Sequence, residues 1–143
     1  MITTELDPKN ISEAAEKIPA DTPFLMLNLL RYRETANYSG QNGLQFKTGR
    51  EAYLQGYLPA FGAVASGSEV TKSIKPILIG SVIQTIVGPV DEKWDDVALV
   101  QYPNFAAFRA VAESEEYQRD AEPHRLAALE NLRLIAIIQR DRP

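Results

Sequence analysis

The chain has 143 residues, a formal net charge of −4 at pH 7, no cysteine and a single histidine. The lack of cysteine excludes disulfides, thiolate zinc sites and a cysteine nucleophile. Lysine and arginine are scattered without a basic run, which argues against nucleic acid or an anionic membrane as a partner. There is no apolar run of roughly 20 residues and no signal-peptide pattern at the N-terminus. We therefore expect a cytoplasmic protein that forms one domain over residues 1–143.

The first predicted elements are a helix and a buried strand. Residues 7–18 begin with an Asp-Pro pair, a typical N-cap and first helical residue, and apolar residues then recur at helical spacing. Residues 23–31 form an apolar run of strand length, with Asn28 on one face and Arg31 on the other. The polar segment 33–47 predicts a long loop.

The middle of the chain predicts a helix followed by two strands. Residues 48–51 match a capping box, and the helix that they begin places Tyr53 and Tyr57 on one face. Residues 76–87 are rich in β-branched side chains and predict a strand, with a break or bulge at its Gly-Ser pair. Residues 94–102 predict the third strand.

The C-terminal part predicts two helical segments and a last strand. A helix begins at Pro103, a second helical segment covers 115–130 with an interruption or restart at Pro123, and residues 132–139 form the strand. After the first helix the order is β-α-β-β-α-β. This order predicts an α+β, ferredoxin-like fold, an antiparallel sheet with helices on one face and an extra N-terminal helix.

The predicted strands are apolar on both faces. An antiparallel sheet with one face in water should alternate between apolar and polar residues, and the segments 97–102 and 132–138 do not alternate. Because the chain's own helices cover one face, we expect a second copy of the chain to cover the other through a two-fold contact. In the alternative, the N-terminal helix and the long loop cover that face.

Six segments together resemble the longer members of the DUF1330 family. They are residues 24–33, 49–53, 86–89, 94–103, 116–118 and 124–130, and the match extends from residue 23 to residue 137. This resemblance implies the dimeric α/β-barrel superfamily, in which two ferredoxin-like sheets face each other. The function of the family is unknown, so the resemblance implies a fold and a homodimer and no particular reaction.

The motifs of three common enzyme classes are absent from the sequence. The chain has no glycine-rich nucleotide loop, no metal-ligand spacing around its histidine and no nucleophile elbow. We therefore predict no metal and no cofactor from motifs. The candidate site consists of polar residues that fall within apolar elements.

Three of these candidates fall in the first half of the chain, and each allows two interpretations. Asn28 would be either an amide that orients a ligand or a core amide bonded to backbone. Arg31 would bind an anionic group through two parallel hydrogen bonds or carry a charge at a rim or interface. Tyr53 would belong to a pocket wall or to the core.

The remaining candidates fall in the second half. Trp94 would stack on a flat ligand or plug one end of the barrel and pack the dimer. Tyr117 and His124 share a face if their helix is continuous, and Arg125 lies beside them. At a fresh helix start His124 would be a neutral imidazole, able to act as a general base or a haem ligand, or else a hydrogen-bonded structural residue.

Together these residues predict a homodimeric protein that binds a small molecule in a pocket between sheet and helices. If it is an enzyme, we expect acid–base or oxidative chemistry on a small aromatic or acidic metabolite, with His124 as base and Asn28 and Trp94 orienting the substrate. Some cofactor-independent monooxygenases and haem-degrading enzymes of the dimeric α/β-barrel superfamily use similar residues on similar elements, an analogy at the level of the fold. The alternative is a non-catalytic dimerisation or binding module.

Overall fold

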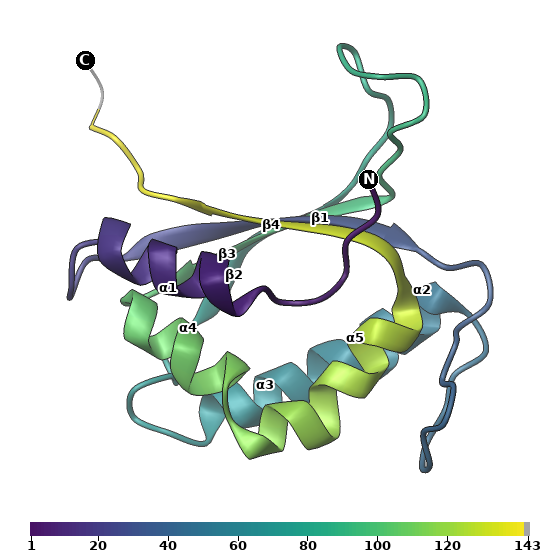
Figure 1. The fold of residues 1–143 in the computed structure, drawn as a ribbon, viewed down its shortest axis with the longest axis horizontal. Coiled ribbons are helices and arrows are strands. Elements are labelled where there is room, and N and C mark those ends of the chain that lie inside the picture. Colours follow the sequence, from purple (N-terminus) through teal and green to yellow (C-terminus); the bar gives the residue numbers. More distant parts are fainter. Residues whose placement is uncertain (142–143) are drawn as a thin grey trace.

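The computed structural model describes residues 1–141, which form a four-stranded antiparallel sheet with helices against one face (Figure 1). The elements are, in order, α1 (Pro8–Lys17), β1 (Phe24–Tyr32), α2 (Gly49–Glu51), the π-helical turn η1 (Ala52–Tyr57), α3 (Leu58–Ser66), β2 (Lys75–Ser81), β3 (Asp96–Tyr102), α4 (Phe105–Ala112), the π-helical turn η2 (Tyr117–Ala121), α5 (Glu122–Ala128) and β4 (Leu129–Ile137). The ferredoxin-like order predicted from the sequence is confirmed, with α1 as the extra helix.

The sheet places β1 at its centre. The strands lie in the order β2-β3-β1-β4, and Asn28 pairs with Ala98 on β3 and with Leu134 on β4. Successive residues of a strand point to opposite faces. Met26 and Asn28 therefore point toward the helices, and Leu27 points away from them.

The helix side of the sheet carries the core. Helix α1 packs there beside α4, in a cluster whose buried members include Ile18, Phe24, Met26, Phe105 and Phe108. The loop 33–47 also lies on this side, where the backbone N–H of Asn37 donates to the Ala127 carbonyl at 2.9 Å. Neither segment covers the opposite face, contrary to the alternative considered above.

The opposite face of the sheet is apolar, and no element within residues 1–141 covers it. By their register, Leu78, Ile135 and Ile137 point to this side, and they are 54%, 45% and 37% exposed. Burying such side chains is favourable in water, since each fully buried aliphatic residue contributes roughly 1.5–3 kcal/mol. We call this surface the open face.

The segment 82–95 projects from the side of the open face as an arm between β2 and β3 (Figure 1). The sequence predicted strands over 76–87 and 94–102, but β2 ends at Ser81 and β3 begins at Asp96. A hydrogen bond of 2.8 Å from the Val82 amide to the Asp95 carbonyl closes the base of the arm. Beyond this bond the β-branched residues have no neighbouring strand, and β propensity alone does not form a strand.

Each π-helical turn is followed, after one intervening residue, by a proline. η1 precedes Pro59 at the start of α3, and η2 precedes Pro123 at the start of α5. Proline donates no backbone hydrogen bond, which interrupts the α-helical pattern and favours a wider turn upstream. The consequence is local: η1 carries Tyr53 and Tyr57, and η2 carries Tyr117, with each of these side chains turned toward the sheet.

Candidate functional site

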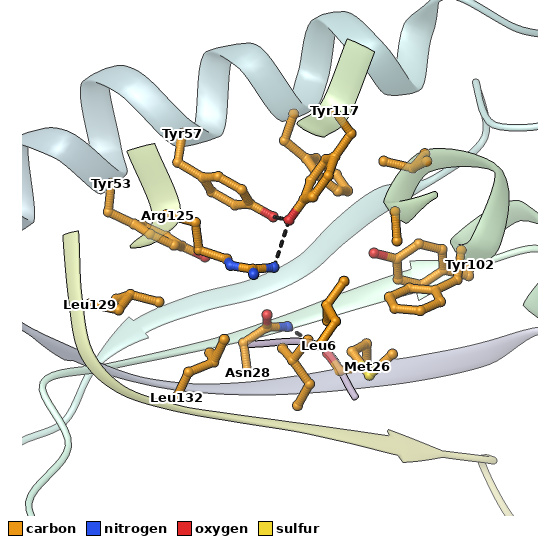
Figure 2. Close-up of a pocket in the computed structure, with 15 residues that line it drawn as sticks. Leu6, Met26, Asn28, Tyr53, Tyr57, Tyr102, Tyr117, Arg125, Leu129 and Leu132 are labelled. Atoms are coloured by element: carbon orange, nitrogen blue, oxygen red, sulfur yellow. Dashed lines mark hydrogen bonds between the residues drawn. The ribbon is translucent and has the colours of Figure 1, made fainter. Parts of the chain in front are cut away.

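A small cavity lies between the centre of the sheet and the helices (Figure 2). Its volume is about 30 Å³, enough for roughly two or three water molecules at roughly 10–15 Å³ each. Its apolar walls include Leu6, Met26, Phe61, Phe108, Leu132 and Leu134. The polar side chains that reach it are Asn28, Arg125, Tyr53, Tyr57, Tyr102 and Tyr117.

The charged group of this cavity is the guanidinium of Arg125, which is only 4% exposed. Its Nη1 donates to the Tyr117 hydroxyl at 2.8 Å, and its Nη2 lies 3.8 Å from an oxygen of Glu122. Its Nε is buried and has no hydrogen-bond partner within residues 1–141. A buried cation is costly unless it is paired and hydrogen-bonded, so this guanidinium has unused capacity for an anionic acceptor.

The tyrosines around Arg125 are neutral hydrogen-bonding groups. The hydroxyls of Tyr57 and Tyr117 lie 3.0 Å apart. Burial raises the pKa of both phenols, and the nearby Arg125 offsets part of this effect. Burial likewise raises the pKa of Tyr53 and Tyr102. The site therefore combines one cation with neutral hydroxyls, a set that suits a carboxylate better than a second cation.

Asn28 faces Arg125 from the floor of the cavity. Its Nδ2 donates to the carbonyls of Met26 and Ala98 at 3.1 and 3.3 Å. These bonds fix the amide, and Figure 2 shows its oxygen directed upward to the side where the guanidinium lies. Asn28 is therefore bonded to core backbone, as the second interpretation of the sequence expected, and it also lines the cavity.

Two larger cavities adjoin the one at Arg125. The first, about 290 Å³, lies between α3 and the strands β2 and β3. It shares with the Arg125 cavity the residues Asn28, Tyr53, Tyr57, Phe61 and Tyr102. The second, about 440 Å³, lies between the N-terminal segment, α1 and β4. It shares Leu6, Met26, Phe108, Leu132 and Leu134. A molecule bound at Arg125 thus has space on two sides.

The structure brings together four of the residues predicted from the sequence: Asn28, Tyr53, Tyr117 and Arg125. Arg31 and Trp94 lie elsewhere. The Nε of Arg31 forms an ion pair of 3.0 Å with Glu130, and both side chains are more than a third exposed. The ring of Trp94 lies under the guanidinium of Arg133, whose carbon is 5.2 Å from the ring centre.

His124 faces the loop 33–47 and lies outside the Arg125 cavity. Its Nδ1 is 2.7 Å from the Tyr38 hydroxyl, and partial burial lowers the pKa of the imidazole. The helical segment is continuous from Tyr117 to Ala128, but Tyr117 lies in the π-helical turn η2 and His124 in α5, and the two side chains do not reach a common site. A side chain at Gly56 would clash with the imidazole, since a Cβ there would lie 2.7 Å from Nδ1.

The surroundings of His124 do not fit a haem. The cleft beside it measures about 200 Å³ and is lined by Tyr38, Gln41, Asn42, Leu44, Arg119, Asp120 and Pro123. Pockets for large ligands are mostly apolar and reach roughly 300–1,000 Å³. This cleft is smaller and mostly polar. Within residues 1–141 no group of three or more histidine, aspartate or glutamate side chains could hold a metal ion.

Some cavity residues were not among the sequence candidates. On β3, Tyr102 lies an even number of residues from Ala98, so both side chains point toward the helices. This alternation could have identified Tyr102 from the sequence. Leu6 gives no such signal, because it precedes the first helix. It reaches the cavity because the N-terminal segment runs along β4, where the Leu132 amide donates to the Thr3 carbonyl at 2.8 Å.

Comparison with solved structures supports the fold. A protein of unknown function from Rhodopseudomonas palustris is 28% identical, with a TM-score of 0.83 over 99% of this chain and 100% of that chain. A methylated form of that protein is 29% identical, with a TM-score of 0.76 over 97% of this chain and 96% of that chain. No family model and no curated protein matches the chain. In the described part of the chain, no helix is both long and apolar enough to cross a membrane.

Proposed function

We propose that the chain is a homodimeric protein that binds a small, partly apolar acid, with its carboxylate in the cavity at Arg125 and its apolar body in the adjoining space. The observation that carries this proposal is the buried guanidinium, which has an unpaired Nε and only one acidic group within 4.0 Å among the described residues. Every other side chain that lines the cavity is uncharged.

The physical argument is that an acid would complete the hydrogen bonding of the cation. A carboxylate can accept two parallel bonds from a guanidinium, and hydrogen bonds to charged groups contribute roughly 1.5–3 kcal/mol. The Tyr117 hydroxyl holds Nη1 in place before a ligand arrives, which reduces the ordering cost of binding. The surrounding leucine, methionine and phenylalanine side chains favour a ligand with an apolar body.

The dimer part of the proposal rests on the open face. Its exposed aliphatic residues lie on the side of the sheet opposite the cavity, so a second copy could cover them without closing the ligand site. The resemblance to the DUF1330 family supports the same arrangement. Catalysis by His124 is not included in this proposal, because its imidazole faces a different cleft.

Isothermal titration calorimetry with benzoate, hexanoate and benzamide tests the ligand site. We expect both acids to bind the wild-type protein and benzamide, which has no charge, to bind more weakly. Arg125→Met should weaken acid binding roughly 10- to 100-fold, the loss of one charged interaction. Arg119→Met is the control, because Arg119 is an exposed arginine that pairs with Asp120 outside the cavity.

Two results would contradict the ligand site: neither acid binds the wild-type protein, or both bind Arg125→Met as tightly as wild type. A dimer without acid binding would favour the alternative of a non-catalytic dimerisation module, since the open face would then be the functional surface.

A further inference from the structure

The cavity between α3 and β2 is suited to an apolar ring. Its volume is about 290 Å³, roughly twice that of a 150 Å³ apolar cavity that accepts benzene. Of its side chains, Lys72 alone carries a charge, and Lys72 pairs with Glu69 at the surface. The remaining walls are mostly aliphatic and aromatic, so this space favours an uncharged, apolar group.

Four aromatic side chains are common to this space and the Arg125 cavity. Tyr53, Tyr57, Phe61 and Tyr102 line both, so the two cavities adjoin along these rings. Rings of this kind pack favourably on another aromatic ring in offset or edge-to-face contact. A ligand that holds its acid at Arg125 and extends toward α3 would meet these rings first.

The cavity on the other side of Arg125 is less suited to the body of an acid. Its charged side chains are Glu5 and Asp7 from the N-terminal segment and Arg133 from β4. The two carboxylates outnumber the cation, and Arg133 already donates to Thr3, Asn131 and the Met1 carbonyl, so this lining is less favourable for a negatively charged ligand. The body of the ligand should therefore extend from Arg125 toward α3.

We infer that the ligand is an arylalkanoate, with its carboxylate at Arg125 and its aromatic ring in the cavity between α3 and β2. This inference rests on the proposed function, because it needs an acid at Arg125. It adds the class of the acid and the residues that select it. An acid without a ring would bind only through Arg125, and an uncharged aromatic molecule would bind only in the larger cavity.

Gly62 gives a substitution that fills the larger cavity selectively. It lines this cavity from α3, and a Cβ placed on it meets no atom within 4 Å. A Cβ at this position should therefore fit without a clash, and leucine also has a higher helix propensity than glycine, so we expect Gly62→Leu to fold. Ala63→Leu is the matched control, because Ala63 is an exposed neighbour on the same helix that lines neither cavity.

The experiment is calorimetric titration of hydrocinnamate, its amide and propionate into wild type, Gly62→Leu, Ala63→Leu and Arg125→Met. We expect hydrocinnamate to bind wild type at least roughly tenfold more tightly than propionate, from burial of the ring. Gly62→Leu should remove this advantage and leave propionate binding unchanged. Ala63→Leu should behave as wild type, and Arg125→Met should weaken both acids.

The outcomes separate this inference from the proposed function. If both acids bind equally and depend on Arg125, the arylalkanoate inference is overturned and the acid site remains. The same holds if hydrocinnamate binds tightly but Gly62→Leu does not weaken it, because the ring then lies elsewhere. If Arg125→Met changes no affinity, or if no acid binds, both proposals fail.

Discussion

Substitution of Ile135 tests whether a second copy of the chain covers the open face of the sheet. Ile135 lies on β4 opposite Leu27 and is 45% exposed in the single chain. Because the Ile135 side chain is partly exposed in the isolated subunit, a smaller or charged residue there should leave that subunit folded. Ile135→Ala removes apolar area, and Ile135→Glu also places a carboxylate in the proposed interface.

The expected size of the effect follows from this exposure. Full burial of an isoleucine contributes roughly 1.5–3 kcal/mol, so burying the exposed part contributes about 1 kcal/mol per subunit. In a two-fold dimer both copies of Ile135 lie in the interface, so the substitution changes the free energy of association twice. Ile135→Ala should therefore raise the dimer Kd roughly 10- to 30-fold. Ile135→Glu would also bury two carboxylates at several kcal/mol each, which raises Kd at least roughly 1,000-fold.

Light scattering and sedimentation velocity over a range of protein concentrations measure this Kd. At micromolar concentration the wild-type protein should have twice the 15.9 kDa mass of the chain, and Ile135→Glu should have the mass of one chain. Ala63→Glu adds the same charge on the exposed side of α3 and should remain dimeric. A wild-type mass of 15.9 kDa would contradict the proposed dimer. An Ile135→Glu variant that stays dimeric with native circular dichroism would show that the open face is not the interface.

Three further predictions concern stability, each measured by urea unfolding. Arg125→Met should leave the free energy of unfolding unchanged or raise it by about 1–3 kcal/mol, because an incompletely paired buried cation is removed; a clear loss would contradict this. The raised pKa of Tyr57 means that folding favours the neutral phenol, so stability should hold below pH 10, fall above it, and fall less in Tyr57→Phe. The lowered pKa of His124 means that folding favours the neutral imidazole. Stability should therefore fall as pH drops below 6.5, and His124→Gln should lack this dependence.

The sequence predicted the fold well because its local signals agree with one another. The N-cap of the predicted capping box is present, since the Thr48 hydroxyl accepts from the Glu51 backbone N–H at 3.0 Å. The alternation of β1 was also correct, since Met26 and Asn28 share one face, and the structure shows that this face is turned toward the helices. The prediction failed over 82–87, where β-branched residues form the arm, because a strand needs a hydrogen-bonding partner that propensity cannot supply.

The site was harder to predict than the fold, because its geometry depends on how helices rotate. His124 and Arg125 are neighbours in sequence, but one faces the loop 33–47 and the other faces the sheet. The π-helical turn before Pro123 alters the phase between Tyr117 and α5, and regular helical spacing does not describe that change. Periodicity could list these polar residues, but it could not decide which of them share a cavity.

The most direct test of the acid site is the nuclear magnetic resonance signal of the Arg125 Nε–H group. This group is buried and has no partner within the described residues, so its proton should shift downfield when a carboxylate binds. We expect hydrocinnamate to produce this shift and its amide not to, while the Nε–H signal of the exposed Arg119 stays in place. An Arg125 signal that is unchanged at a saturating concentration of hydrocinnamate would contradict the acid site.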